Sequence, residues 1–268
     1  PPHIYGGAGV HVEYLSRELS RLMEVDVRCF GDQNAGDSDL RVRGYEVPAG
    51  ALDASAPQLK SPLEALARCL DMAAPPDTGE ADVVHCHTWY SHFGGVLAKL
   101  CHGLPLVITT HSLEPLRPWK REQLGRGYDL SSWVERTALG MADAVIAVSK
   151  ETKADVLANF PEVDPARVQV IPNGIDVDEY RRTDDRSALD RFNIPPGLPY
   201  VLFVGRVARQ KGIIHLVRAI RHLEPGLGVV LCAGAPDTPE IAAEMERGVA
   251  EISAQREHVY WIQEMLPR

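Results

Sequence analysis

The sequence predicts an α/β protein made of two Rossmann-like, doubly wound parallel-sheet domains, the second of them incomplete. Short β-branched runs alternate with helical hydrophobic periods along nearly all of the 268 residues, as expected where a helix follows each strand of a parallel sheet. A polar, Pro-containing stretch divides two such series. The second series supplies three strands, whereas a complete doubly wound domain carries about six.

The first domain is predicted to span residues 1–176. We expect helices at about 8–23, 61–72, 93–102, 130–141 and 150–160, and strands at 25–30, 82–87, 106–110, 144–148 and 168–171. Ser61 and Pro62 are typical of an N-cap and a first helical turn. A Gly-rich loop opens the chain, whereas such loops normally follow a strand. We therefore expect that the first strand of this domain is missing.

The second domain is predicted to span residues 200–268. Pro172-Asn173-Gly174 indicates a turn, and the polar stretch at 177–199 is predicted to be a linker. Beyond it we expect a strand beginning at Tyr200, a helix at 213–223, a strand at 228–232, a helix at about 239–254 and a strand at 258–262. The chain is thus expected to be a fragment, truncated at both ends.

Composition narrows the possible functions. The chain is 45% hydrophobic and carries a net charge of −9, from 28 basic and 37 acidic residues, which argues against non-specific binding to nucleic acid or to an anionic membrane. No apolar run approaches the length of a membrane span. The five cysteines are scattered and mostly lie in apolar runs, as buried thiols do in a reducing compartment. We therefore expect a cytoplasmic protein whose anion sites are local, with a homodimer as one possible assembly.

Two cations follow the first strand of the second domain. Arg206 and Lys211 lie in the turn between that strand and a helix whose apolar face begins at Ile213. A helix N-terminus favours anions, and two added cations suit a dianion such as a diphosphate. The alternative is a surface turn whose basic side chains are solvated.

Gly6 and Gly7 begin a glycine-rich entry to the first helix. Glycines allow backbone N–H groups to approach a phosphate or a sugar closely, although a structural turn explains the pattern about as well. The spacing does not match Gly-x-Gly-x-x-Gly, and Asp26 lies early in its strand for a ribose-binding acid. A dehydrogenase is therefore disfavoured.

Histidines lie at the ends of two predicted strands. His111 follows the strand at 106–110, and ligands of open parallel sheets bind outside the carboxyl ends of strands. The alternative is a loop histidine that makes one hydrogen bond. His85 and His87 have an H-x-H spacing that can ligate zinc, but no third or fourth ligand spacing accompanies them, so hydrogen bonding at the strand edge is favoured. His87 and Tyr90 remain candidates for lining a sugar site.

A basic loop follows His111. It contains Arg117, Trp119, Lys120, Arg121 and Arg126. The Trp119 ring offers an apolar face on which a sugar could stack, and the cations could bind a phosphate-bearing acceptor. A solvated loop is an equally good explanation of the pattern.

Taken together, five motifs make the chain resemble the retaining glycosyltransferases of family 4, which have the two-domain GT-B fold. The motifs are Tyr5-Gly-Gly-Ala-Gly-Val-His11, Asp82-Val-Val-His-Cys-His-Thr-Trp89, Thr110-His-Ser-Leu-Glu-Pro-Leu-Arg-Pro-Trp-Lys120, Val170-Ile-Pro-Asn-Gly-Ile-Asp176 and Phe203-Val-Gly-Arg-Val-Ala-Arg-Gln-Lys-Gly212. The resemblance spans essentially the whole chain. The third motif points within the family to the group of glycogen synthases and α-maltose-1-phosphate synthases.

The resemblance implies a specific chemistry. It implies ADP-glucose as the donor, and glucose 1-phosphate or the non-reducing end of an α-1,4-glucan as the acceptor, with the α configuration retained. Arg206 and Lys211 match residues that hold the donor diphosphate, Gly6 and Gly7 match the loop that approaches the phosphates and the sugar, and His111 matches an active-site histidine. No cofactor or metal ion is expected, because Arg206, Lys211 and the N–H groups of the helix start can stabilise the charge on the diphosphate in place of a metal ion.

Part of the family pattern and several alternatives stay open. The family's later pair of glutamates is expected beyond Arg268, so this fragment alone is expected to be inactive. A family member that uses a UDP- or GDP-sugar remains possible. So do a two-lobed sugar-binding protein without catalysis and an epimerase or phosphorylase of the same fold, although no pyridoxal lysine can be located.

Overall fold

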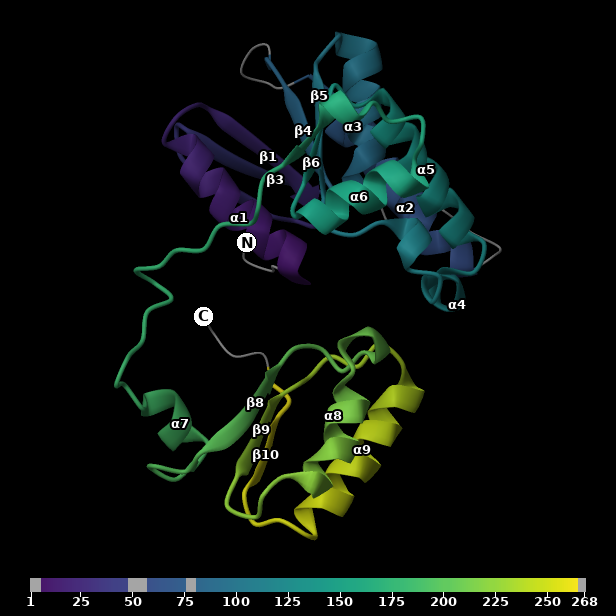
Figure 1. Ribbon diagram of the computed structural model, residues 1–268. Coiled ribbons are helices and arrows are strands. Elements are labelled where there is room, and N and C mark those ends of the chain that lie inside the picture. Colours follow the sequence, from purple (N-terminus) through teal and green to yellow (C-terminus); the bar gives the residue numbers. More distant parts are fainter. Residues whose placement is uncertain (1–5, 48–56, 76–80, 265–268) are drawn as a thin grey trace. The chain divides into compact units, whose positions relative to one another are not determined.

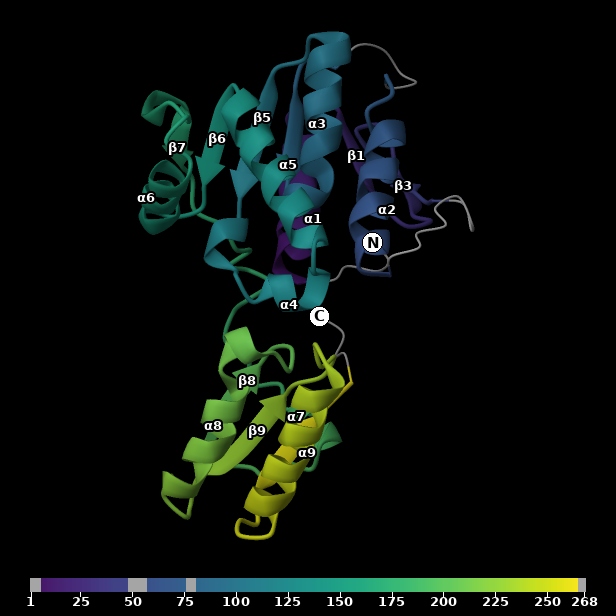
Figure 2. The same ribbon diagram turned by 90° about the vertical axis from the view of Figure 1, so that its right-hand side faces the viewer.

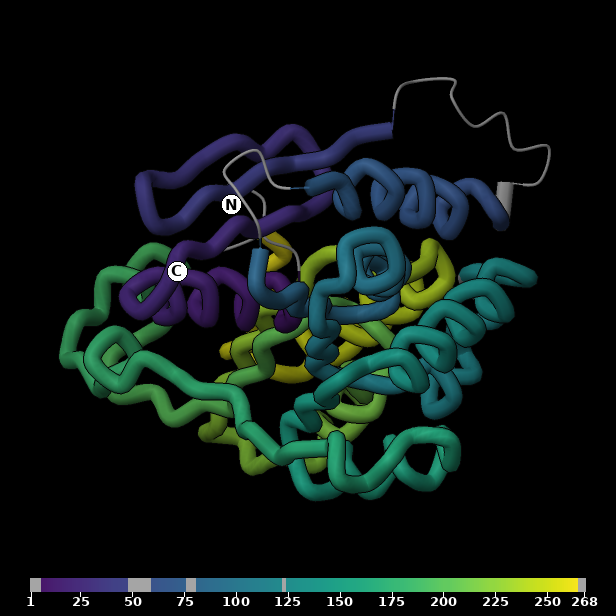
Figure 3. The backbone as a smooth tube through the Cα atoms, turned by 90° about the horizontal axis from the view of Figure 1, so that it is seen from above, coloured from purple at the N-terminus to yellow at the C-terminus, as the bar shows by residue number. Residues whose placement is uncertain are grey.

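The structure, a computed structural model, describes residues 6–47, 57–75 and 81–264. It divides into two compact units, one reaching to Ile175 and the other beginning at Asp176. Figure 3 traces the backbone through both units. Each unit is a layered α/β structure with its own hydrophobic core.

A small sheet comes first in the first unit. Its central strand β3 (Leu40–Tyr45) pairs in parallel with β1 (Val25–Phe30) and antiparallel with β2 (Asn34–Gly36). Helix α1 (Gly6–Ser20) packs against β1 and β3 (Figure 1). β2 and β3 were not predicted, because their short sequences contain glycine, asparagine and arginine and lack a long apolar run.

A four-stranded parallel sheet forms the rest of the first unit. Its order is β4 (Val84–His87), β5 (Leu106–Thr110), β6 (Ala144–Ala147) and β7 (Val168–Val170). Right-handed crossovers through α3 (Trp89–His102), α5 (Gly127–Met141) and α6 (Lys150–Asn159) place these helices on one face. The core between them and the sheet includes Leu106, Ile108 and Val145, which are fully buried. The predicted single sheet of this domain is therefore, among the described residues, two sheets.

Helix α2 (Pro57–Met72) lies beside α3 (Figure 2). The prediction that Ser61 and Pro62 begin this helix is wrong, because Pro62 lies inside it. Proline costs an interior helix one backbone hydrogen bond, and packing against α3 sustains the helix around it. Helix α3 also begins earlier than expected, at Trp89, because Trp89 and His92 are buried and extend its inward face.

The second unit is a three-stranded parallel sheet with helices on both faces. Its order is β10 (Val259–Ile262), β9 (Gly228–Cys232) and β8 (Tyr200–Val204). Helices α8 (Ile213–Ala219) and α9 (Pro239–Ser253) cover one face (Figure 1). A short 3-10 turn (Ile220–His222) completes the helix that was predicted at 213–223.

The other face of this sheet is covered by residues that the sequence placed in a linker. Helix α7 (Ser187–Arg191) and the residues after it bring Leu189, Phe192 and Ile194 against Val230 and Ile262. Ile194 is 2% exposed. The later part of the stretch at 177–199 therefore belongs to the core of the second unit, and its apolar residues were too widely spaced to reveal this.

Candidate active site

Histidines gather at the carboxyl edge of the four-stranded sheet. Side chains alternate along a strand, so His85 and His87 of β4 share a face, and the register pairs His87 with Thr109 of β5. His111 lies two residues after Thr109, so the same alternation places it on the face that His85 and His87 share. The helices α3, α5 and α6 pack against the opposite face, which leaves the imidazoles free to meet one another.

The rings are in direct contact. His87 Nδ1 lies 3.2 Å from His111 Nε2, and their rings stack with centroids 5.5 Å apart. His85 lies behind them, with its Nε2 2.7 Å from Thr109 Oγ1 and its ring 4.3 Å from that of His87. Helix α1 brings His11 to the group, 5.3 Å from His87 and 4.8 Å from His111 between ring centroids.

Burial keeps these imidazoles neutral. Desolvation, followed by repulsion from neighbouring histidines, lowers the pKa of His87 to about 2 and those of His85 and His111 to about 4. Desolvation also lowers the pKa of His11. A neutral imidazole has one N–H donor and one acceptor nitrogen. The cluster therefore offers paired donors and acceptors without charge, which suits the hydroxyls of a sugar.

The backbone is strained where β4 meets α3. Thr88, between His87 and Trp89, has a φ of 64° although it carries a β-branched side chain. Such strain is concentrated at functional sites, where the surrounding structure holds it in place. The Ser91 hydroxyl helps to hold the backbone next to Thr88 in place, because it accepts from the His87 N–H and donates to the His87 carbonyl.

Tyr90 and Trp89 form an aromatic pair at the start of α3. Their ring centroids are 4.4 Å apart, and Tyr90 is 43% exposed whereas Trp89 is buried. Tyr90 is thus accessible, as a residue that lines a sugar site must be. The role of Tyr90 in lining a sugar site stays a prediction.

The loop after His111 is built around a buried carboxylate. Glu114 Oε1 lies 2.6 Å from Lys120 Nζ, Glu114 Oε2 accepts from the Ser131 hydroxyl, and the Tyr128 hydroxyl donates to the Glu114 carbonyl. The Glu114 N–H donates to Glu135 Oε2 at 2.7 Å. These contacts attach the loop to α5.

This network changes the expected role of Lys120. Its side chain is 7% exposed, and its ammonium is bound by Glu114, so it does not present a free charge to a phosphate as predicted. It begins α4 (Lys120–Leu124) and stabilises the loop instead. The other two predicted acceptor residues remain accessible: Trp119 is 42% exposed, and Arg117 is partly exposed with its guanidinium 3.3 Å from Ser112 Oγ.

Glu135 is the unusual member of this network. It is 3% exposed, and its pKa is raised to about 8, mainly by desolvation and also by the charge of Glu114, although the hydrogen bond from the Glu114 N–H opposes the change. Lys120 and Arg117 are the cations near these two carboxyl groups, and with its raised pKa Glu135 holds a proton at neutral pH. Desolvation lowers the pKa of Lys120, although Glu114 opposes that change.

Gly6 and Gly7 begin α1, the helix that carries His11. Both are exposed, Gly6 has a φ of 78°, and a side chain at either position would meet nothing within 4 Å. Their backbone is therefore open to solvent, as an approaching ligand requires. Only Gly6 needs the left-handed conformation that favours glycine.

In the second unit, hydrogen bonds fix the turn after β8. The Val207 N–H donates to the Gly234 carbonyl, and the Asp237 N–H donates to the Val207 carbonyl. This places Arg206 Nη1 2.5 Å from Asp237 Oδ1. Lys211 ends a 3-10 turn (Arg209–Lys211), is exposed, and has no ion-pair partner within residues 6–47, 57–75 and 81–264. Of these two cations, Arg206 is thus held by an ion pair, whereas Lys211 has none in the described residues; Arg209, the third cation of the turn, pairs with Glu244.

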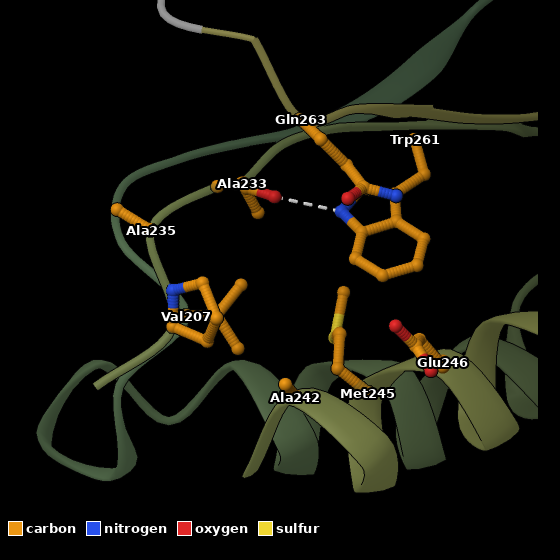
Figure 4. A pocket seen from close by; sticks show the side chains of 10 residues that line it. Val207, Ala233, Ala235, Ala242, Met245, Glu246, Trp261 and Gln263 are labelled. Atoms are coloured by element: carbon orange, nitrogen blue, oxygen red, sulfur yellow. Dashed lines mark hydrogen bonds between the residues drawn. The ribbon is translucent and has the colours of Figure 1, made fainter. Parts of the chain in front are cut away.

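A small apolar cavity lies under the same loops (Figure 4). Val207, Met245 and Trp261 line it, and the Trp261 indole N–H donates to the Ala233 carbonyl at 2.7 Å. This bond connects β10 to the end of β9. Among the described residues, no basic side chain lines the cavity and its one charged lining residue is the acid Glu246, so it does not suit a diphosphate, and we assign it to the support of the loops that carry Arg206 and Asp237.

Three of these residues were missed as site residues from the sequence. His11 lies in the first motif and was given no role, although its position one helical turn after Gly7 would place it near the same ligand. Glu135 sits in a helical pattern that gives no sign of burial. His92 is 2% exposed, and neither of its ring nitrogens has a hydrogen-bond partner among the described residues.

His11 brings a third imidazole to this strand end. Ligand nitrogens of His11, His87 and His111 all lie within 4.8 Å of one another. His87 of the H-x-H pair belongs to this group and His85 does not. The three histidines are far apart in the sequence, so no local spacing indicates that they meet.

Comparison with known proteins identifies the class. Residues 5–179 match the family model described as Glycosyltransferase Family 4. The chain is 46% identical over 274 residues to the α-maltose-1-phosphate synthase of Mycolicibacterium smegmatis and 44% identical over 271 residues to that of Mycobacterium tuberculosis. The alignments cover 100% and 99% of this chain and 67% and 66% of those proteins, so the chain spans about two thirds of their length.

Solved structures agree on the fold. The sucrose-phosphate synthase of Thermosynechococcus elongatus matches 97% of this chain and 65% of its own with a TM-score of 0.76 and 20% identity. The catalytic domain of starch synthase IV from Arabidopsis thaliana, bound to ADP and acarbose, matches 98% of this chain and 72% of its own with a TM-score of 0.62 and 19% identity.

The chain therefore belongs to glycosyltransferase family 4. This confirms the predicted enzyme class, a glycosyltransferase, and the predicted GT-B type of fold with its Rossmann-like domains. Among the described residues, no helix is both long and apolar enough to cross a membrane.

Proposed function

We propose that the protein is a retaining α-glucosyltransferase that transfers glucose from ADP-glucose to glucose 1-phosphate and so forms α-maltose 1-phosphate. The observation that carries this proposal is the neutral imidazole cluster of His11, His87 and His111 at the carboxyl edge of a parallel sheet, where such folds bind ligands. The identity of 44–46% to proteins named α-maltose-1-phosphate synthases supports α-maltose 1-phosphate as the product, and therefore glucose 1-phosphate rather than a glucan as the acceptor.

In the first unit, uncharged hydrogen-bonding groups would orient the sugar. His111 would contact the donor glucose through a hydroxyl, with its ring held by His87. The backbone at Gly6 and Gly7 is open enough for an approaching sugar or phosphate. Arg117 and Trp119 would bind the phosphate and the ring face of the acceptor, because both are accessible on a loop that Glu114 anchors.

In the second unit, Arg206 and Lys211 would bind the donor diphosphate. When the bond from glucose C1 to the diphosphate oxygen breaks, the electron pair leaves with ADP, and negative charge grows on that oxygen. Cations already in place stabilise this charge more in the transition state than in the ground state. The acceptor 4-hydroxyl attacks C1 from the same face and passes its proton to the departing oxygen, so the α configuration is kept. We propose that this requires no metal ion.

Product analysis tests this function. The full-length protein, given ADP-glucose and glucose 1-phosphate, should release ADP and form a disaccharide phosphate, which phosphorus NMR and mass spectrometry identify. If the protein elongates glycogen and forms no disaccharide phosphate, the acceptor is a glucan and not glucose 1-phosphate. If it uses UDP-glucose or GDP-glucose and not ADP-glucose, the proposed donor is wrong.

A further inference from the structure

Three imidazoles from three separate elements have the arrangement of a metal site. His11 comes from α1, His87 ends β4 and His111 follows β5, and their ligand nitrogens lie within 4.8 Å of one another. With zinc–nitrogen bonds of about 2.0–2.1 Å, two ligands of a tetrahedral ion lie about 3.4 Å apart. The 3.2 Å between His87 Nδ1 and His111 Nε2 is already close to that value.

The third imidazole has a nitrogen to offer. His11 Nε2 is buried and has no hydrogen-bond partner within the described part of the chain. A buried polar atom left unpaired costs free energy, and such an atom in a native structure calls for a ligand. The His11 ring stands edge-on to that of His111 with centroids 4.8 Å apart. Its ligand nitrogen lies within 4.8 Å of those of His87 and His111, and so completes a three-nitrogen set.

The surroundings favour one class of ion. Among the described residues, no carboxylate belongs to the cluster. Imidazole nitrogens suit zinc, copper and nickel, whereas magnesium and calcium prefer oxygen. Metal-bound histidines are usually oriented by a second set of contacts, and here His85 packs on the His87 ring while bonding Thr109. Three neutral nitrogens leave a fourth position of a tetrahedral ion open.

We propose that His11, His87 and His111 bind one divalent transition-metal ion of the Zn²⁺ class, and that the bound ion blocks the enzyme. A nitrogen that ligates a metal has given up the lone pair that would accept a hydrogen bond from a sugar hydroxyl. Metal and sugar therefore compete for the same imidazoles. The blocking part rests on the proposed function, and the binding part does not.

The binding part is tested without substrate. Metal-free full-length protein, titrated with Co²⁺, should take up one ion and develop the intense visible absorption of a tetrahedral site. Calorimetric titration with Zn²⁺ should give one ion with a dissociation constant of about 1 μM or lower. Zn²⁺ should also raise the thermal midpoint, because binding only the folded state stabilises it. A weak, octahedral Co²⁺ spectrum in the unmutated protein overturns the site even if every variant fails to fold.

Variants identify the ligands. His11→Gln and His87→Gln should each weaken Zn²⁺ binding at least tenfold, while His215→Gln, an exposed histidine of the second unit, should bind as the parent does. Circular dichroism confirms that each variant is folded. Equal affinity in His11→Gln and the parent overturns the assignment.

The blocking part has its own readout. If the parent transfers glucose, Zn²⁺ should abolish the transfer at the concentration that fills the site, and a chelator should restore it. Full activity with the site filled overturns competition while leaving the site in place. Absence of transfer with and without metal contradicts the proposed function, while the binding result stands.

Discussion

The two units present opposite kinds of polar surface. In the first, the histidines are partly or largely buried, touch one another and are neutral, because burial lowers the pKa of each. In the second, the cations of the turn after β8 lie closer to solvent, one held by Asp237 and the other without an ion pair in the described residues. Neutral, fixed groups suit the recognition of hydroxyls, and cations suit a leaving diphosphate. Under the proposed function, this difference would give binding specificity to the first unit and charge stabilisation to the second.

The largest effect that tests this division is on turnover. Lys211→Ala removes the free cation of the turn, and we expect kcat to fall about 100- to 1,000-fold with little change in KM, because the contact strengthens as charge develops. Release of ADP from ADP-glucose by the full-length protein measures it. Arg218→Ala, an exposed cation that pairs with Glu244 in the same unit, is the matched control and should retain the parent rate. Equal rates in the two variants would contradict the assignment.

The next effect is on stability and belongs to the first unit. Lys120→Met removes the closer of the two cations that pair with the buried Glu114 carboxylate and leaves only the guanidinium of Arg117 at 3.9 Å, and we expect the free energy of unfolding to fall by about 3 kcal/mol. Denaturation in urea measures it. Arg121→Met is the control, because it removes the neighbouring cation of the same helix from an exposed pair with Asp129. It should unfold as the parent does, and a loss of the same size in both variants would show that Lys120 is not specially placed.

The sequence predicted the fold better than the site. Helices and buried strands are repeated along the chain as hydrophobic periods, so α5, α6 and β5 could be anticipated to within a few residues. β2 and β3 could not, because polar and glycine-rich strands hold together through pairing with a neighbour. Leu189 and Ile194 carry no signal that they pack on β9 and β10.

The site depends on contacts between distant residues. The strand ends marked His87 and His111, but His11 joins them only through the packing of α1. The basic loop was recognised from composition, which counts Lys120 as one more surface cation. Its burial follows from Glu114 being enclosed by α5, and nothing local to the loop encodes that. Sequence patterns thus predict which residues are polar and near a strand end. Ion pairing and burial in the folded protein then decide which of these side chains can still contact a ligand.

A third test concerns the pH dependence that the buried network imposes. The pKa of Glu135 is about 8 in the fold and 4.5 in its ordinary state, so between these values the folded protein binds more protons than the unfolded chain. Stability is then lost as the pH rises from about 4.5 through 8. Glu135→Gln removes this loss, and we expect its stability to gain on that of the parent as the pH rises between these values, by at most about 1.4 kcal/mol per pH unit.

Urea denaturation at several pH values measures this gain. Glu162→Gln, which alters a surface pair with Arg136, should follow the pH profile of the parent. A parallel pH profile for Glu135→Gln and the parent would show that Glu135 is ionised in the fold.

The smallest expected effect concerns how the second unit holds its bound cation. Asp237→Asn keeps the shape of the side chain that touches Arg206 and removes its charge, so the guanidinium loses part of what orients it. We expect KM for ADP-glucose to rise about threefold to tenfold, a change of about 1 kcal/mol, with a smaller change in kcat than Lys211→Ala causes. Initial rates over a range of donor concentrations separate the two constants. Glu244→Gln is the control, since it alters a carboxylate of the same unit that pairs with Arg209 and Arg218. A lower KM in Asp237→Asn would reverse the argument, because it would mean that Asp237 withholds Arg206 from the diphosphate.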